Sequence, residues 1–206
     1  MKAARHARGL VVILLGAFAC ASKGPPPVEE GDVIFQPSLS PQSLAIQKAT
    51  HSVYSHVGLV TFRDGKPYVL EAEATVRATA LAEWLQRGDG GHYVVRRLID
   101  AHQVLDAASV AELRKQMRRF EGKAYDSTFE WSDERLYAAE LVWKVYERAL
   151  GIRLCEPQQL RDLDISVPEV EAKLVERFGE HVPLDEPVVS AQRIFESTRL
   201  ETVAER

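Results

Sequence analysis

The stretch HSVYSHVGLVTFRDGKPYVLEAEA, residues 51–74, decides the fold, because it predicts two strands joined by a tight turn. Apolar and polar residues alternate on both sides of Asp64 and Gly65, and an Asp-Gly pair favours a two-residue hairpin loop. With that loop, Gly58 on the first strand faces Glu71 on the second. The pattern therefore predicts an antiparallel hairpin whose register is fixed by its turn.

This register brings together two side chains that can do chemistry. His56 and Glu71 fall on the same sheet face as diagonal neighbours, about 7–8 Å apart along the backbone, and long side chains can bridge that gap. A carboxylate bound to one imidazole nitrogen raises the basicity of the other, which can then take a proton from Cys, Ser or water. The competing interpretation is a core histidine beside a solvent-facing glutamate.

A second informative stretch is WSDERLYAAELVWKVY, residues 131–146, which predicts a helix with Ser132 or Asp133 as its N-cap. Its inward apolar face begins at Ala138, near the start of the helix. Unpaired N–H groups and the helix dipole favour negative charge there, and a thiolate at that place would have a lowered pKa. An alanine uses neither effect, and its simplest explanation is close packing of the helix on a sheet.

The remaining pattern predicts an α+β domain without internal repeats and without a glycine-rich phosphate loop. Asp106 is a cap candidate for one helix, which Gly122 ends and in which Met117 is expected to fill the core, and Thr79 is a cap candidate for another. We expect further strands at residues 32–35 and 92–98, and further helices at residues 40–50, 79–88, 107–121 and 167–179.

Composition limits the classes of partner. The chain has 206 residues, 46% of them apolar, which is enough for one well-packed domain. Its 26 basic and 30 acidic residues give a net charge of -4, which argues against nucleic acid as a partner. There is no C-x-x-C motif or paired-histidine spacing, so we expect no metal and no other cofactor. We expect a monomer.

The N-terminus predicts export. Three basic residues precede an apolar run at residues 10–18, which is shorter than the roughly 20 residues that span a membrane. Residues 17–19 can be an A-x-A cleavage site, or Cys20 can be the lipidated residue of a bacterial lipoprotein signal. Because the chain has two cysteines and one stands at the cleavage point, we favour lipidation over simple secretion.

These features divide the chain into three parts. Residues 1–20 are the expected signal peptide, residues 21–30 a proline-bearing flexible tether, and residues 31–206 the folded domain. We therefore expect the domain at the bacterial cell envelope, facing the periplasm. Its contact with the membrane would be made through the N-terminal lipid anchor alone.

Several ordered motifs resemble the YiiX/YebB-like family, a branch of the NlpC-type papain-like cysteine hydrolases with a circularly permuted core. The resemblance extends from about Gly31 to the VVSAQRIFES stretch near the end. It implies a permuted papain-like fold with an antiparallel sheet packed against helices. The motifs that carry it are GDVIFQ at 31–36, SVYSHVGLV at 52–60, YVLEA at 68–72, EGKAYD at 121–126 and LYAAELVWKVY at 136–146.

The resemblance also implies roles for three residues. His56 matches the general base, Glu71 the residue that orients it, and Ala138 the position of the nucleophilic Cys in a Y-C-S/A-E-L-V motif. Either the nucleophile of an active enzyme has been replaced, or the natural protein has lost it. The intact His56 and Glu71 favour replacement, because an inactive protein has little reason to keep both. Cys155 is too far downstream to substitute and is expected to be buried, and Glu140 lies off the inward face.

The implied activity is attack on an amide of a cell-wall peptide or an amino-acid amide, with lipid-derived acyl groups as another substrate class. Without the thiol, the chain as written should be nearly inert. Tyr54 stands two residues before His56 and is expected on the same strand face. Tyr54 and Tyr125 are candidates for lining the pocket or donating to an oxyanion, and otherwise lie at the edge of the core. Two alternatives to a hydrolase stay open: a protein that binds such ligands without cleaving them, and a structural lipoprotein.

Overall fold

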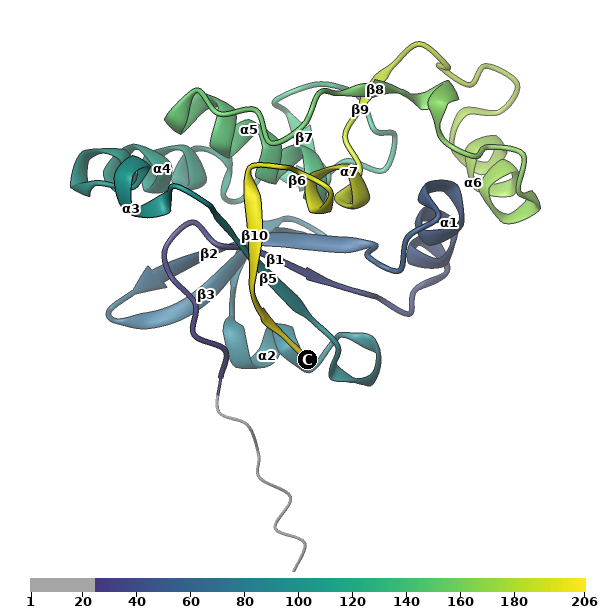
Figure 1. Cartoon of the computed structure of the whole chain (residues 1–206). Helices are drawn as coiled ribbons and strands as arrows, with labels where there is room; N and C mark the ends of the chain where they lie inside the picture. Colours follow the sequence, from purple (N-terminus) through teal and green to yellow (C-terminus); the bar gives the residue numbers. More distant parts are fainter. Residues whose placement is uncertain (1–24) are drawn as a thin grey trace, which may run out of the picture.

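The computed structural model describes residues 25–206, so that the expected signal peptide, Cys20 and the first part of the tether lie outside the described residues. Its centre is a six-stranded antiparallel sheet with the strand order β10-β5-β1-β2-β3-β4 (Figure 1). The strands are β1 (Val33–Gln36), β2 (His56–Arg63), β3 (Lys66–Ala72), β4 (Val76–Ala80), β5 (Val94–Leu98) and β10 (Leu200–Glu205).

The hairpin has the predicted register. Leu59 pairs with Leu70 and Arg63 with Lys66, as a two-residue turn requires. Both turn residues, Asp64 and Gly65, have positive φ angles of 49° and 73°, and such turns match the right-handed twist of the strands. β2 begins five residues later than predicted, however, because residues 51–55 form the end of the preceding helix and a loop.

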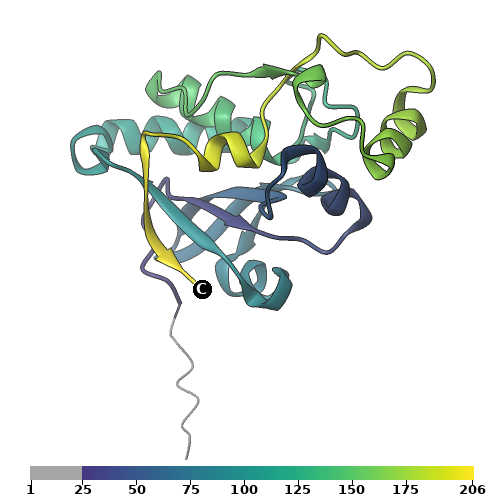
Figure 2. The same cartoon turned by 45° about the vertical axis from the view of Figure 1, so that its right-hand side comes forward.

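The two faces of the sheet are covered differently. On one face, α4 (Ala107–Phe120) and α5 (Ala138–Leu150) bury the main core against β2 and β3. On the other face, the short helix α2 (Leu81–Leu85) covers a smaller cluster centred on Trp84. The views in Figures 1 and 2 show α4 and α5 above the sheet and α2 below it.

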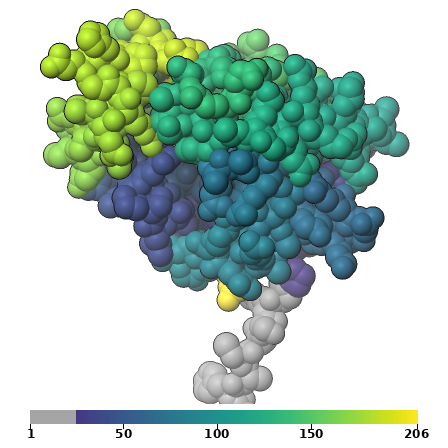
Figure 3. All heavy atoms as spheres, turned by 180° about the vertical axis from the view of Figure 1, so that it is seen from behind, coloured from purple at the N-terminus to yellow at the C-terminus, as the bar shows by residue number. Residues whose placement is uncertain are grey.

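A third cluster lies at one end of the sheet, where α1 (Pro41–Thr50) packs on α6 (Pro168–Phe178). Figure 3 shows the two helices in contact from behind, with α6 in yellow-green above α1 in purple-blue. The chain is completed by α3 (Ala101–Val104), α7 (Ala191–Phe195), the two-residue strands β6 (Ala124–Tyr125), β7 (Arg135–Leu136), β8 (Gln158–Gln159) and β9 (Pro187–Val188), and 3-10 turns at Asp89–Gly91 and Leu160–Asp162.

Some predicted element boundaries were wrong. Residues 76–80 form β4, so that Thr79 lies in a strand and does not cap a helix. α5 starts at Ala138, because Arg135 and Leu136 pair with β6 and therefore cannot be helical, so neither Ser132 nor Asp133 caps it.

The cap expected at Asp106 is confirmed, since its carboxylate accepts a hydrogen bond from the Ser109 N–H at 2.8 Å. Met117 is buried in the core, as expected.

The described part of the expected tether, residues 25–30, lies against the domain. Glu30 accepts hydrogen bonds from Thr61, from the backbone N–H of Phe62 and from Arg114. The folded domain therefore begins before Gly31. The last residues of the segment 21–30, which was expected to be a flexible tether, belong to the domain. Charged contacts that the proline-rich composition did not predict hold this segment in place. None of the helices in residues 25–206 is long and apolar enough to cross a membrane.

Candidate active site

The predicted pair of His56 and Glu71 is present. His56 is the first residue of β2, and its Nε2 lies 2.7 Å from Oε2 of Glu71 on β3. The imidazole also stacks on Trp84 of α2, with ring centroids 5.9 Å apart and an interplanar angle of 24°. The histidine is thus held from two directions, by a carboxylate and by an aromatic ring.

Two further residues, which the sequence did not reveal, complete the surroundings of Glu71. The Thr79 hydroxyl donates to Oε1 at 2.6 Å, and the guanidinium of Arg87 donates to the same oxygen. Arg87 also lies 3.0 Å from Glu73, which borders the same cavity. Thr79 lies in β4, a strand that the sequence did not predict, and Arg87 lies in the turn after α2. The residue spacing of the hairpin therefore gives no indication that either one reaches Glu71.

These donors determine the charge of Glu71, whose side chain is 0% exposed. Burial by itself would raise the pKa of Glu71, but the hydrogen bond and charge of His56, with the hydrogen bonds from Thr79 and Arg87, outweigh burial and lower the pKa to about 2. An ionised carboxylate can only accept, so Nε2 of His56 carries a hydrogen. Nδ1 is left as the ring nitrogen available for proton transfer.

Ala138 is the first residue of α5. The preceding Tyr137 occupies the N-cap position, and no side chain caps the helix. The Tyr137 hydroxyl accepts a hydrogen bond from the backbone N–H of Val189 at 2.9 Å, which anchors the helix start. The first N–H groups of the helix have no partners within it, so this end can stabilise negative charge.

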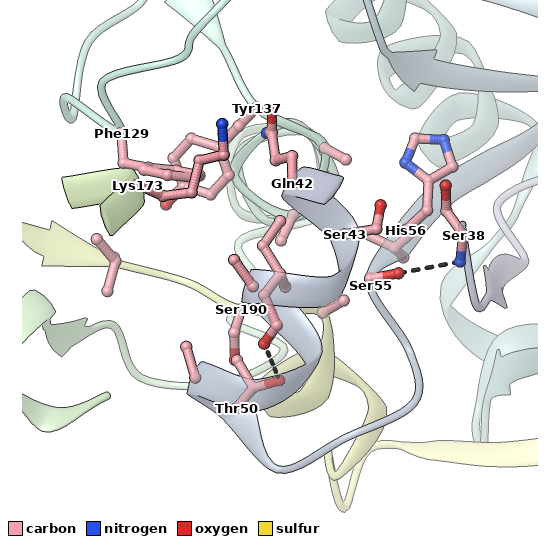
Figure 4. A pocket seen from close by; sticks show the side chains of 18 of the residues that line it. Ser38, Gln42, Ser43, Thr50, Ser55, His56, Phe129, Tyr137, Lys173 and Ser190 are labelled. Atoms are coloured by element: carbon pink, nitrogen blue, oxygen red, sulfur yellow. Dashed lines mark hydrogen bonds between the residues drawn. The ribbon is translucent and has the colours of Figure 1, made fainter. Parts of the chain in front are cut away.

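His56 and Ala138 line one cavity, with a volume of about 450 Å³. His56 lies on the α2 face of the sheet and α5 packs on the opposite face, but both residues stand at the end of the sheet where the cavity opens. Figure 4 shows the His56 ring, Ser43 and Tyr137 around this space. The arrangement places an imidazole and a helix N-terminus on the same cavity.

The two tyrosine candidates lie in different places. Tyr125 lines the cavity and accepts a hydrogen bond from the amide of Gln42, and burial raises its pKa. Tyr54 is not among the lining residues and instead stacks on Phe195 at 4.3 Å and on His92 at 5.9 Å. The expected placement of Tyr54 beside His56 assumed strand alternation, but residue 54 lies in the loop before β2.

Glu140 lies in the first turn of α5, and its side chain is 0% exposed. Lys144 Nζ lies 2.7 Å from its Oε1 and forms a buried ion pair with it, and the same ammonium group donates to the Ser132 carbonyl and to Asp133. Burial raises the pKa of Glu140 to about 7 against the opposing effect of Lys144. We expected the residue to lie off the inward face of the helix, but it is fully buried.

Cys155 lies apart from this site. It packs at the edge of the main core and does not line the cavity of His56, and burial raises the pKa of its thiol to about 11. The thiol is therefore protonated and poorly nucleophilic at neutral pH.

The imidazole of His56, held by a carboxylate, thus lines one cavity together with the first residue of a helix, at an antiparallel sheet. The chain matches the model of the permuted papain-like amidase family, YaeF/YiiX, C92, over residues 27–204, and it belongs to this family. The predicted permuted papain-like fold and family are thus confirmed.

Two relatives support the assignment. The chain is 49% identical over 176 residues to the uncharacterized protein YiiX of Escherichia coli strain K12, an alignment that covers 85% of this chain and 86% of that protein. It also superimposes on the crystal structure of yiiX from Escherichia coli O157:H7, called a metalloprotein, with a TM-score of 0.83 and 48% identity. That match covers 89% of this chain and 99% of the other.

Proposed function

We propose that the cavity is the acyl-transfer site of a cysteine amidase in which Ala138 occupies the position of the nucleophile. The chain as written then binds an amide ligand and does not cleave it at a useful rate. The observation that carries this proposal is the hydrogen bond between His56 and Glu71, which engages Nε2 and leaves Nδ1 of the imidazole for proton transfer. His56 lines the same cavity as Ala138. Family membership supports the amidase class.

With a cysteine at position 138, each group has a defined task. His56 takes the thiol proton, and the thiolate attacks the amide carbon to form a tetrahedral oxyanion near the first N–H groups of α5. The protonated imidazole then gives its proton to the amine as the C–N bond breaks, which leaves a thioester. Water, deprotonated by His56, hydrolyses the thioester and restores the thiol. With alanine, no bond to substrate can form.

We further propose that the ligand is a peptide amide of the cell wall or an amino-acid amide, met by a monomer at the periplasmic face of the cell envelope. The basic and apolar leader, with Cys20 as acceptor of a lipid anchor, supports this location. A ligand-binding role without turnover is the natural consequence of Ala138 if the residue is native.

The relative from Escherichia coli O157:H7 is called a metalloprotein, which makes a metal worth testing against the residues of this site. Residues 25–206 contain no group of three or more His, Cys, Asp and Glu side chains that could hold a metal ion. Glu71 already accepts hydrogen bonds from His56, Thr79 and Arg87, so its oxygens are engaged. The donor set of the described residues therefore does not fit a metal.

The test is to restore the thiol with Ala138→Cys. We expect its alkylation by iodoacetamide at pH 7 to be at least tenfold faster than that of Cys155, because a helix N-terminus and an imidazole both stabilise a thiolate. The variant should also hydrolyse amino-acid 4-nitroanilides, and the chain with Ala138 should not. Cys155 serves as the internal control, and a Cys155→Ser background isolates the new thiol. A thiol at position 138 that reacts no faster than Cys155 and cleaves no amide would overturn the proposal.

A further inference from the structure

Gln36 is a buried polar residue that the proposed mechanism does not use. It is the last residue of β1, it is 2% exposed, and it lines the same cavity as His56 and Ala138. Its Oε1 has no hydrogen-bond partner among residues 25–206. Because a buried amide oxygen without a partner is costly, its position in a cavity wall points to a partner that arrives with a ligand.

The strand register places Gln36 beside the proposed base. Gln36 pairs directly with His56 across β1 and β2. Ile34, two residues earlier on β1, belongs to the cluster on the α2 face, so alternation puts Gln36 on that face too, where His56 stacks on Trp84. Side chains paired in this way have β-carbons about 4.5–5.5 Å apart. His56 therefore has Glu71 on its β3 side and Gln36 on its β1 side.

Gly88, in the turn after α2, makes room for the amide of Gln36. A β-carbon at residue 88 would lie 2.9 Å from the Oε1 of Gln36, which is too close for a side chain at this position. The same turn carries Arg87, which donates to Glu71, so that one turn packs on both neighbours of the base. Because Oε1 has no hydrogen bond within the described part of the chain, the amide can rotate about its last bond to meet a ligand.

The proposed reaction defines what lies next to Gln36. The imidazole of His56 gives its proton to the leaving nitrogen, so that nitrogen must lie within hydrogen-bond reach of Nδ1. A side chain paired with His56 is therefore close to the same nitrogen. A peptide-type amide nitrogen carries a hydrogen, whereas the corresponding oxygen of an ester carries none, and the side-chain oxygen of Gln36 can only accept.

We propose that Gln36 is a substrate-binding residue whose side-chain oxygen accepts a hydrogen bond from the N–H of the scissile amide. This inference rests on the proposed function and adds a residue that selects amides over esters. A bound amide gives the Oε1 of Gln36 its missing donor. A bound ester places its own oxygen against Oε1 and leaves both oxygens without a donor, and a polar site rejects an analogue that lacks one hydrogen in this way.

Binding to the chain with Ala138 tests the inference, because no turnover interferes. NMR titration at pH 7 would compare alanine N-methylamide with alanine methyl ester, which carry the same amine. We expect the amide to bind about fivefold more tightly or better, and we expect Gln36→Met, which keeps the length of the side chain, to reduce this preference below about twofold. A preference below twofold in the unmodified chain, a preference that survives Gln36→Met, or no measurable binding of the amide would overturn the inference.

A buried glutamine elsewhere in the domain provides the matched control. Gln116 on α4 is 8% exposed and also has an Oε1 without a partner among the described residues, but it does not line the cavity. Gln116→Met should therefore leave the preference for the amide at its value in the unmodified chain. An equal loss of preference in the two variants would show that Gln36 does not read the N–H.

A third ligand keeps the test valid if Gln36→Met fails to fold. Alanine N,N-dimethylamide is an amide without an N–H, so it should bind the unmodified chain as weakly as the ester does. Binding as tight as that of the N-methylamide would contradict the inference.

Failure here is separable from failure of the proposed function. If Ala138→Cys cleaves amides while the preference for an N–H does not depend on Gln36, only the role of Gln36 is wrong. If the preference depends on Gln36 while Ala138→Cys is inert, the cavity binds amides and the hydrolase proposal is wrong.

Discussion

Two fully buried glutamates stand on the two sides of the candidate site, and their surroundings are opposite. Glu71, on the side of the base, accepts hydrogen bonds from three side chains, and its pKa is lowered to about 2. Glu140, in the first turn of α5, forms an ion pair with Lys144, and burial raises its pKa to about 7 against the opposing effect of that lysine. Donors outweigh burial at Glu71, whereas burial outweighs the single ion pair at Glu140.

The difference changes how an intact His56 and Glu71 should be interpreted. A buried carboxylate with three donors is part of the folded structure, and removal of one partner from such a network is costly. The chain therefore has a structural reason to keep this pair even if it never cleaves a substrate. Retention of the pair alone does not distinguish a replaced nucleophile from a natural loss.

The largest expected effect concerns activity. In the Ala138→Cys background, His56→Ala should reduce amide hydrolysis about 10⁴-fold, because a nucleophile and its base act as a unit. The measurement is kcat/KM on an amino-acid 4-nitroanilide, together with the rate of thiol alkylation at pH 7. His92→Ala is the matched control, since His92 stacks on Tyr54 and does not line the cavity. Similar losses of kcat/KM in the His56→Ala and His92→Ala variants would show that His56 has no catalytic role.

The next effect concerns stability. Glu71→Ala should lower the free energy of unfolding by about 3–5 kcal/mol, because it leaves donors on His56, Thr79 and Arg87 without their acceptor. Glu73→Ala, two residues away and half exposed, should cost less than about 1 kcal/mol. Urea unfolding at pH 7 measures both. If the two substitutions cost the same, the hydrogen bonds to Glu71 do not stabilise the fold.

The sequence predicted the parts of this site that depend on local pattern. The Asp-Gly turn and the alternation of the strands determine the hairpin register, and the register alone brings His56 to Glu71. Thr79 and Arg87 could not be predicted, because they reach Glu71 through strand pairing and a loop that no periodicity indicates. The position of Tyr54 was wrong for a related reason, since a loop ended the alternation before β2 began.

The two glutamates should also respond to pH with opposite signs. Both pKa values start from an ordinary value of 4.5. The stabilisation from Glu71, whose folded pKa is lower, is present above pH 4.5 and is lost as the pH falls toward 2. Glu140 has a raised folded pKa, so its contribution is greatest below pH 4.5 and declines as the pH rises through 7, by on the order of 3 kcal/mol.

Glutamine substitutions separate these two contributions. Glu140→Gln should match the native chain at pH 5 and exceed its unfolding free energy by on the order of 3 kcal/mol at pH 8, because the amide cannot ionise. Glu71→Gln should instead remove the loss of stability between pH 4.5 and 2. Urea unfolding across this pH range gives both curves. A Glu140→Gln curve parallel to that of the native chain would show that Lys144 fully compensates the buried charge.

The smallest expected effect isolates the hydroxyl that donates to Glu71. Thr79→Val keeps the shape of the side chain and should lower the free energy of unfolding by about 1–2 kcal/mol. Thr61→Val is a close control, because the Thr61 hydroxyl donates to Glu30 at 2.7 Å in the same sheet but away from the cavity. Both variants should lose similar stability. In the Ala138→Cys background, however, only Thr79→Val should also slow hydrolysis, by about threefold to tenfold, because it loosens the carboxylate that orients His56. Equal rates in the two variants would mean that Thr79 stabilises the sheet and does not position the base.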